Sequence, residues 1–442
     1  MFWNFFPIDK KEVDIYPKKT HLESQTLNHS IEIDLKSIDL NAIWIVRRLR
    51  INGFEAYLTG GCVRDLLLQK KPKDFDIATN AKPEEIKFLF ANSRLIGRRF
   101  LLTHIFFADG KLIETATFRA NPLNSKSNLS KDLLLKCDNV FGKLEDDAKR
   151  RDFTINALFY DPIKEKVYDF VGAKEDLKNK VIRTIGDPDI RLREDPVRIL
   201  RGIKFAARLN FTIEKETLAG MKSHVADLTR CAPLRLQEEL SCFLTSGNSF
   251  TAIKLCYEIG VLDVLMPELI EGLGIVFDTT NNELKKTEVE HLTNKFKNLD
   301  QILNVLDKIC IRECYISPSV AFAAILFPVY KAFKTLFKNE KDWIDKICTN
   351  WAGRIKLTKK DQNKIKLLLS SSLIMSNEQK NTKIVEHLIE KKWFREALLM
   401  HIINLFSQNK TLESVEKWKL SANNAGKLYI QKKNDIKSIF FK

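Results

Sequence analysis

Two short motifs in the first quarter of the chain combine residues suited to nucleotide chemistry. In the first, Gly60 and Gly61 stand between an apolar run and a helical pattern, and Arg64 follows one turn later. Glycines let backbone amides approach a phosphate, a helix N-terminus favours negative charge, and arginine adds a forked cationic donor. The pattern predicts a phosphate-binding turn, although a purely structural strand-to-helix turn has the same residues.

The second motif is Asp74-Phe75-Asp76, in a run that reads as a strand. Side chains at i and i+2 share one strand face, with Cα atoms about 7 Å apart. Two such carboxylates can hold a pair of divalent ions roughly 4 Å apart, as phosphoryl transfer requires. Alone, the pair is more typical of a solvated edge strand or a turn; together with the glycine turn ten residues earlier, it favours catalysis.

A third carboxylate is needed to complete the metal site or to take the proton of an attacking hydroxyl. Glu114 and Asp152 are the two candidates, and their spacing does not choose between them. Glu114 stands in a strand-like run and can share the sheet face of the aspartate pair. Asp152 follows two arginines, so it can instead cap a helix or pair with Arg151.

The elements that must position these residues form an α/β unit with mixed strands. Strands are expected at 54–59, 74–78, 104–108 and 112–118, and helices at 43–49, 63–68 and 79–90. Asp109-Gly110 between the last two strands predicts a hairpin. After Gly186 the pattern is helical. The expected division is an N-terminal extension (1–30), a head (31–180), a neck (181–270) and a body with a basic tail (271–442).

Composition narrows the class of protein. The chain has 442 residues, a net charge of +16 and eight scattered cysteines. The positive charge, concentrated after residue 350, predicts a polyanionic partner. No apolar run is long enough to span a bilayer and no signal peptide is evident, so a cytoplasmic location without membrane contact is expected. The cysteines lack the spacing of a zinc site.

Four motifs in order resemble one family of enzymes. They are Gly60-Gly61-x-x-Arg64, Asp74-x-Asp76, Arg151-Asp152-Phe153-Thr154-x-Asn156 and Glu194-Asp195-Pro196-Val197-Arg198. Together they resemble the template-independent RNA nucleotidyltransferases, the class shared by bacterial poly(A) polymerases and CCA-adding enzymes. The resemblance implies a small α/β head of the polymerase-beta type, followed by an all-α neck, body and tail.

The resemblance also implies roles for these residues. Asp74 and Asp76 would bind two magnesium ions. The triphosphate of ATP would contact Gly60, Gly61 and Arg64. Arg151 and Asn156 would handle the nucleotide, Asn156 toward the ribose, and Asp152 would be either catalytic or nucleotide-binding.

Base recognition is assigned by the same resemblance to Asp195 and Arg198, which are expected on one face of a helix because they are three residues apart. The carboxylate can accept from the adenine amine while the guanidinium donates to the adjacent ring nitrogen. Arg201 and Lys204 continue this face and are expected to meet phosphates, unless the face is merely solvated. Lys204 stands where CCA-adding relatives are expected to have arginine.

The block at 95–105 resembles the poly(A) branch rather than the CCA-adding one. In it, Arg98 and Arg99 are expected to contact RNA or triphosphate, the alternative being a structural ion pair. In the tail, Lys391, Lys392 and Arg395 flank two aromatics, a composition that suits RNA, although such aromatics more often belong to a helix core.

The expected activity is therefore addition of AMP from ATP to RNA 3′ ends. RNA and ATP are the expected partners, and no obligate protein partner is evident. One alternative is a CCA-adding enzyme that uses CTP and ATP. A remote alternative is an RNA-binding protein without catalysis.

Overall fold

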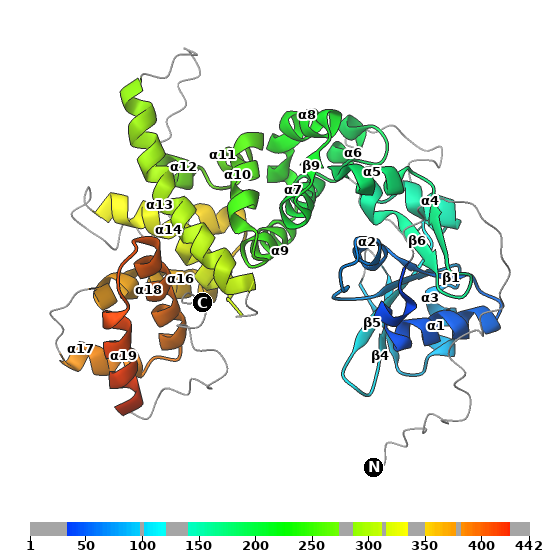
Figure 1. Cartoon of the computed structure of the whole chain (residues 1–442), viewed down its shortest axis with the longest axis horizontal. Coiled ribbons are helices and arrows are strands. Elements are labelled where there is room, and N and C mark those ends of the chain that lie inside the picture. Colours follow the sequence, from blue (N-terminus) through cyan, green and yellow to red (C-terminus); the bar gives the residue numbers. More distant parts are fainter. Residues whose placement is uncertain are drawn as a thin grey trace.

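The computed structural model describes residues 33–97, 101–120, 140–273, 286–311, 315–334, 350–376 and 382–424. An α/β head lies at one end of the molecule and a helical body at the other, and the helices between them form an arch (Figure 1). The predicted extension, 1–30, lies outside the described residues. Within the described part, no helix combines the length and apolar character needed to cross a membrane.

The head contains one mixed sheet of seven strands in the order β3-β4-β5-β2-β1-β6-β7. Only β2 and β5 pair in parallel. The strands are β1 (Ala56–Thr59), β2 (Asp76–Thr79), β3 (Ser93–Ile96), β4 (Leu102–Phe106), β5 (Leu112–Thr117), β6 (Leu158–Asp161) and β7 (Lys166–Asp169). The predicted hairpin is confirmed: β4 and β5 are antiparallel, and Gly110 takes the positive φ of +80° in their turn.

The two faces of this sheet bury different side chains because neighbouring strand residues point in opposite directions. Leu58 and Ile77 pack in the large core that also includes α1, whereas Tyr57 and Ala78 belong to a smaller cluster with Ala148. The helices of the head are α1 (Leu40–Ile51), α2 (Gly61–Leu67), α3 (Pro83–Leu89), α4 (Leu144–Lys149) and α5 (Ala173–Asn179), with short 3-10 turns at Leu35–Ser37 (η1) and Thr154–Asn156 (η3).

One expectation for the head is wrong. Asp74 does not share a strand with Asp76, because β2 begins at Asp76 and Asp74 lies in a bend before it. The physical reason lies in the neighbouring strand: Thr59, the last residue of β1, pairs with Asp76, and at Gly60 the chain turns away. Asp74 therefore has no partner in β1 to hold it in the sheet.

From residue 181 on, the regular elements of the described residues are helices apart from the short pair β8 (Val181–Ile182) and β9 (Thr212–Ile213). The helices are α6 (Pro188–Glu194), α7 (Val197–Leu209), α8 (Lys215–His224), η4 (Val225–Arg230), α9 (Pro233–Leu244), α10 (Ser249–Ile259), α11 (Val261–Leu265), α12 (Pro267–Leu273), α13 (Lys286–Ile311), α14 (Pro318–Lys334), α16 (Lys359–Ser376), α17 (Thr382–Ile389), α18 (Phe394–Ser407) and α19 (Glu413–Asn424). On α7, Ile199 and Ile203 form a buried stripe.

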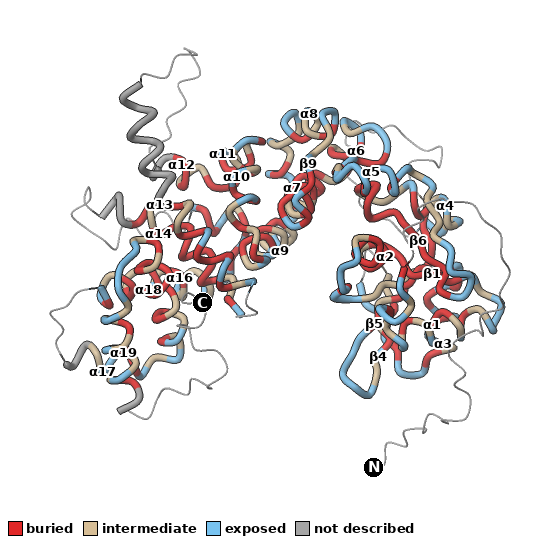
Figure 2. Tube along the Cα trace, in the orientation of Figure 1, coloured by how far each residue is buried: buried red, intermediate tan, exposed pale blue. Residues whose placement is uncertain are grey.

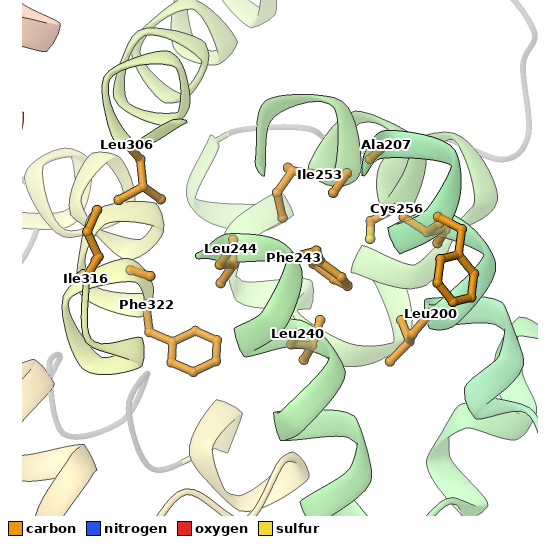
Figure 3. Close-up of a cluster of buried hydrophobic side chains, with 14 of the residues drawn as sticks. Leu200, Ala207, Leu240, Phe243, Leu244, Ile253, Cys256, Leu306, Ile316 and Phe322 are labelled. Atoms are coloured by element: carbon orange, nitrogen blue, oxygen red, sulfur yellow. The ribbon is translucent and has the colours of Figure 1, made fainter. Parts of the chain in front are cut away.

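Neck and body share an apolar core. Leu200 of α7, Phe243 of α9 and Cys256 of α10 pack in one cluster with Leu306 of α13 and Phe322 of α14 (Figure 3). Buried positions recur along the helices of the arch and in the body (Figure 2), and they belong to one apolar cluster. A continuous core of this kind holds α7, which carries the predicted base-reading residues, on a stiff support.

Candidate active site

The backbone of the glycine turn lies close to the side chains of three site residues. Gly60 has φ +74° and ψ −133°, a conformation that other residues rarely adopt. A Cβ there would lie 3.2 Å from Arg151 Nη1 and 3.8 Å from Asp76 Oδ2, and a Cβ on Gly61 would lie 3.5 Å from Arg64 Nη2. The lack of side chains therefore lets two arginines and a carboxylate approach this backbone.

Arg64 is buried behind the turn, with 2% of its surface exposed. Its Nε and Nη2 both donate to Asp65 Oδ1, at 2.8 and 2.7 Å, and its Nη1 donates to Asn156 Oδ1 at 2.7 Å. The structure thus joins Arg64 of the glycine motif to Asn156, which stands 92 residues later in the Arg151–Asn156 motif. Arg64 shapes the turn from behind, and its predicted contact with triphosphate stays a prediction.

Asp76 and Glu114 form an acidic pair across two parallel strands. They are register partners in β2 and β5, so their side chains lie on one face of the sheet. Burial, with the negative charges of Glu114 and Asp74 added, raises the pKa of Asp76 to about 6. Asp74 itself is exposed at the edge of this pair.

These carboxylates suit a hard divalent cation. Among the described residues, no three metal-ligating side chains are already gathered around one point. Magnesium nevertheless prefers carboxylate oxygens and keeps several waters, so it does not require a complete protein cage. Burial and, after it, the negative charge of Glu114 raise the pKa of Asp76, and a bound cation would favour the ionised carboxylates, so the donor set fits magnesium.

The other candidate third carboxylate, Asp152, is engaged elsewhere. Arg201 Nε donates to its Oδ2 at 2.7 Å, and it also accepts from the Phe153 amide and Asn156 Nδ2. Burial alone would raise the pKa of Asp152, but Arg201 and these hydrogen bonds lower it to about 2. Asp152 therefore anchors a helix of the neck to the head.

Arg151 is held in the site by Asp147 of α4, a helix that was not predicted from the sequence. Its Nη2 donates to Asp147 Oδ2 at 2.8 Å, its Nη1 donates to the Asn156 carbonyl, and its guanidinium stacks 4.8 Å from the centre of the Phe159 ring. Asp147 stands four residues before Arg151, the spacing of a helical ion pair, which is the pattern that could have revealed it.

The expected helix face shared by Asp195 and Arg198 is wrong. Asp195 ends α6 in a non-helical conformation, with φ −150° and ψ 87°, and α7 begins only at Val197. Pro196 lacks an amide hydrogen, so it does not continue α6 and stands instead at the N-cap of α7. Asp195 and Arg198 remain neighbours, because the Arg198 amide donates to the Asp195 carbonyl at 3.0 Å.

Each of these two residues has a partner of its own. Arg235 of α9 donates to both oxygens of Asp195, at 2.8 Å each. Arg198 is buried and its Nη1 donates to Glu194 Oε2 at 3.2 Å. The base-reading pair is therefore held in place by Arg235 and Glu194.

A second residue of α9 meets the next two cations of α7. Glu239 accepts from Lys204 Nζ at 2.5 Å, and one of its oxygens lies 3.7 Å from Arg201 Nη1. Arg235 and Glu239 were not identified from the sequence. They stand four residues apart on one helix. An acid and a base at that spacing usually indicate an ion pair within the helix, so the pattern does not predict contacts with α7.

The predicted RNA contacts are placed only in part. Arg98 and Arg99 lie outside the described residues. Arg395 lies in the first turn of α18, and Lys391 and Lys392 lie just before this helix, in the body, at the opposite end of the arch from the sheet (Figure 1).

Two aromatics of the tail are core residues. Phe394 and Trp418 are 3% and 1% exposed, and their ring centres lie 6.1 Å apart. The predicted role in base stacking is therefore wrong for Phe394, since a buried ring offers no face to RNA, and the helix-core alternative holds for it.

Two protein-family models match this chain. One, described as the head domain of poly A polymerase, matches residues 56–183, which include the sheet and the glycine turn. The other, described as the probable RNA and SrmB-binding site of polymerase A, matches residues 210–273 in the helices of the neck. The boundaries agree with the change from mixed sheet to helices.

Individual relatives extend the similarity. A poly(A) polymerase I of Escherichia coli O6:H1 is 33% identical over 430 residues, covering 93% of this chain and 86% of the relative. One from Salmonella typhi is 37% identical over 325 residues, covering 72% of this chain and 64% of the relative, just under two thirds of its length. Among solved structures, the CCA-adding enzyme of Bacillus stearothermophilus in complex with CTP has a TM-score of 0.63 at 21% identity, covering 87% of this chain and 82% of that one.

Proposed function

The chain belongs to the bacterial poly(A) polymerase family, and from this membership and the geometry of the site we propose that it transfers AMP from ATP to RNA 3′ ends without a template. The proposal rests on one observation: Asp76 and its strand partner Glu114 lie next to the turn at Gly60. Phosphoryl transfer requires acidic residues beside a phosphate-binding site.

In the proposed reaction the turn at Gly60 and Gly61 receives the triphosphate, with Arg151 at its edge. Asp74 and Asp76 would hold magnesium, which when bound would neutralise charge on the transferring phosphate. Glu114 takes the proton of the RNA 3′-hydroxyl as that oxygen attacks the α-phosphorus. The bond between the α-phosphorus and the bridging oxygen breaks, and pyrophosphate leaves.

We assign Glu114, rather than Asp152, as the third carboxylate. Glu114 stands beside Asp76 and has 44% of its side chain exposed, so substrate can reach it. Asp152 is fixed by Arg201 and has a pKa of about 2, which makes it a poor proton acceptor near neutral pH. Asp152 acts instead by positioning the helix that carries Arg201.

Adenine selection falls to Asp195 and Arg198. With Arg235 on both of its oxygens, the Asp195 carboxylate has one orientation, and its remaining lone pairs can accept from the adenine amine. A fixed acceptor discriminates against guanine, which presents a carbonyl oxygen at the corresponding position. Selectivity thus comes from protein side chains rather than from a template.

A nucleotide-selectivity assay tests the proposal. Purified chain with magnesium and a labelled generic RNA is given each nucleoside triphosphate separately and then all four. Long products with ATP alone support poly(A) synthesis. Addition limited to three nucleotides, with CTP required and tRNA as the acceptor, would mean a CCA-adding enzyme, and extension of no RNA would favour the binding protein.

We further propose that the purified chain acts on RNA without a helper protein, in the cytoplasm. Its net charge of +16 supports direct attraction to RNA phosphates. The same assay tests the first point, because activity that appears only after addition of a cell extract would contradict it.

A further inference from the structure

Three cations assigned to nucleotide binding surround one aromatic ring. The Cζ atoms of Arg64 and Arg201 lie 5.5 and 5.7 Å from the ring centre of Phe205, and Lys204 Nζ lies 5.3 Å from it. All three distances fall within the roughly 6 Å range of cation–π attraction. Phe205 is only 8% exposed, so the ring is largely shielded from water.

The three cations come from two parts of the molecule. Arg64 belongs to α2 of the head, whereas Arg201 and Lys204 belong to α7 of the neck. The ring of Phe205 therefore contacts both sides of the boundary between head and neck. Its edge packs against Phe153, with ring centres 5.9 Å apart and an interplanar angle of 80°.

Each cation also has a carboxylate partner, and the ring contributes something that these partners do not. Asp65 binds Arg64, Asp152 binds Arg201 and Glu239 binds Lys204, and every such bond occupies N–H donors. The face of an aromatic ring attracts a cation without accepting its in-plane N–H bonds. Phe205 therefore holds the cations close together while leaving their remaining donors available.

We propose that Phe205 is a positioning residue that fixes Arg64, Arg201 and Lys204 in the places they need for ATP binding, an inference that rests on the proposed function. Arg64 borders Gly61 in the phosphate turn. Arg201 fixes Asp152, the neighbour of the arginine that borders Gly60. The ring thus supports the cations that stand beside or behind both glycines.

Fluorination of the ring separates this role from simple packing. Fluorine atoms keep the approximate shape of phenylalanine while withdrawing charge from its face, so each additional fluorine weakens cation attraction. Mono-, di- and trifluorophenylalanine are incorporated at position 205 of the full chain. The dissociation constant of α,β-methylene-ATP, an analogue that resists transfer, is measured by calorimetry with each protein.

We expect the dissociation constant to rise with every fluorine, reaching about tenfold for three. The matched control is Phe243, a buried ring in the apolar core of α9, where the same substitutions leave the constant unchanged. Steady-state kinetics of Phe205→Leu add a second readout: the KM for ATP rises much more than kcat falls.

Two negative results have different meanings. If the unmodified chain binds the analogue but the fluorinated series at position 205 is flat, the role of Phe205 is wrong and the proposed function stands. If the unmodified chain binds no nucleotide analogue at all, the proposed function itself fails. An equal rise at Phe243 would show that fluorination acts through the core, and would also overturn the proposal.

Discussion

Asp76 of β2 and Glu114 of β5 are direct partners in the only parallel strand pair of the described sheet. One stands at the first residue of its strand and the other at the third. The parallel register places both carboxylates on the sheet face that also carries Phe159, the ring under Arg151. The Asp76 carboxylate and the Arg151 guanidinium thus both lie next to Gly60 in the glycine turn.

Loss of the Glu114 carboxylate should stop turnover without unfolding the protein. For Glu114→Gln we expect kcat to fall by about 10²- to 10⁴-fold, because general-base assistance is removed. The KM for ATP and the melting temperature should change little, because 44% of the Glu114 side chain is exposed and a glutamine can keep its 3.4 Å contact with His104 Nε2. Single-turnover extension of labelled RNA measures the effect.

The matched control for this variant is Asp109→Asn, in the adjoining hairpin turn, where the side chain is 48% exposed. It removes one negative charge from the same hairpin and should leave kcat unchanged. A Glu114→Gln enzyme with wild-type kcat would transfer the role of third carboxylate to Asp152.

Asp152→Asn should lower the free energy of unfolding in a pH-dependent way. The pKa of Asp152 is lowered to about 2 in the folded protein, where Arg201 holds the ionised form. The ion pair therefore stabilises the fold at pH values above the unfolded pKa of about 4, and this contribution is lost as the pH falls toward 2. The shift corresponds to about 2 kcal/mol.

Denaturant unfolding of wild type and Asp152→Asn at several pH values checks this. The difference in free energy should be constant from pH 5 to pH 7 and shrink below about pH 4. If the difference in free energy of unfolding stays the same down to pH 3, the variant is destabilised by altered packing around the amide and not by loss of the ion pair.

Asp76→Asn should have the opposite effect on stability in the absence of metal. Burial raises the pKa of Asp76 to about 6, so above that pH the folded state carries an unfavourable charge. Removing the charge should stabilise the metal-free protein by up to about 3 kcal/mol at pH 7.5, and the gain should vanish as the pH falls below about 4. Activity should be lost.

Thermal unfolding in EDTA measures the gain, and repetition with magnesium provides the contrast. Magnesium should raise the melting temperature of wild type more than that of Asp76→Asn, because the variant has lost a ligand. If the variant is no more stable than wild type at pH 7.5 without metal, the ionised Asp76 carboxylate does not destabilise the fold.

Much of the head could be predicted from short-range patterns. Asp109-Gly110 indicates a hairpin by itself, and the two glycines before Arg64 indicate a strand-to-helix turn, because these residues have local conformational preferences. The position of Asp74 could not be predicted in this way. Whether Asp74 continues the strand depends on where β1 ends, and that is a contact between separate segments.

The residues of the site could be predicted from the sequence, but the contacts among their side chains could not. Asp152 and Glu114 were equal candidates in the sequence, and only tertiary contacts distinguish one carboxylate bound to Arg201 from one beside Asp76. Likewise, nothing near Asp195 indicates Arg235, which stands forty residues later and approaches through the packing of α9 on α7.

The contact between Arg235 and Asp195 should control nucleotide choice. In Arg235→Gln the Asp195 carboxylate loses a bidentate partner and can rotate, so adenine is read less strictly. We expect kcat/KM for ATP to fall and the preference for ATP over CTP to drop by about tenfold, equivalent to roughly 1.4 kcal/mol. Competition between the two nucleotides in one reaction measures the preference.

Arg230→Gln is the matched control, because this exposed arginine pairs with Asp227 outside the site. Its nucleotide preference should equal that of wild type. An unchanged preference in Arg235→Gln would show that Asp195 does not depend on Arg235 for base reading.

The basic residues at the start of α18 should contribute to RNA affinity through charge alone. Lys391 and Lys392 stand before buried Phe394, and Arg395 is exposed beside it, so their side chains can be changed without opening the core. Replacing all three by glutamine should weaken binding of single-stranded RNA and lower the slope of log affinity against log salt by about 2. Filter binding from low to moderate salt measures both quantities.

The control for these basic residues keeps the charge, with Lys391→Arg, Lys392→Arg and Arg395→Lys combined in one protein. It should retain the wild-type slope, because counterion release depends on the number of phosphates neutralised rather than on the side chain that neutralises them. The KM for ATP should be unaffected in both triple variants, since α18 lies across the arch from the glycine turn (Figure 1). An unchanged salt slope in the glutamine triple would remove this part of the tail from the RNA-binding surface.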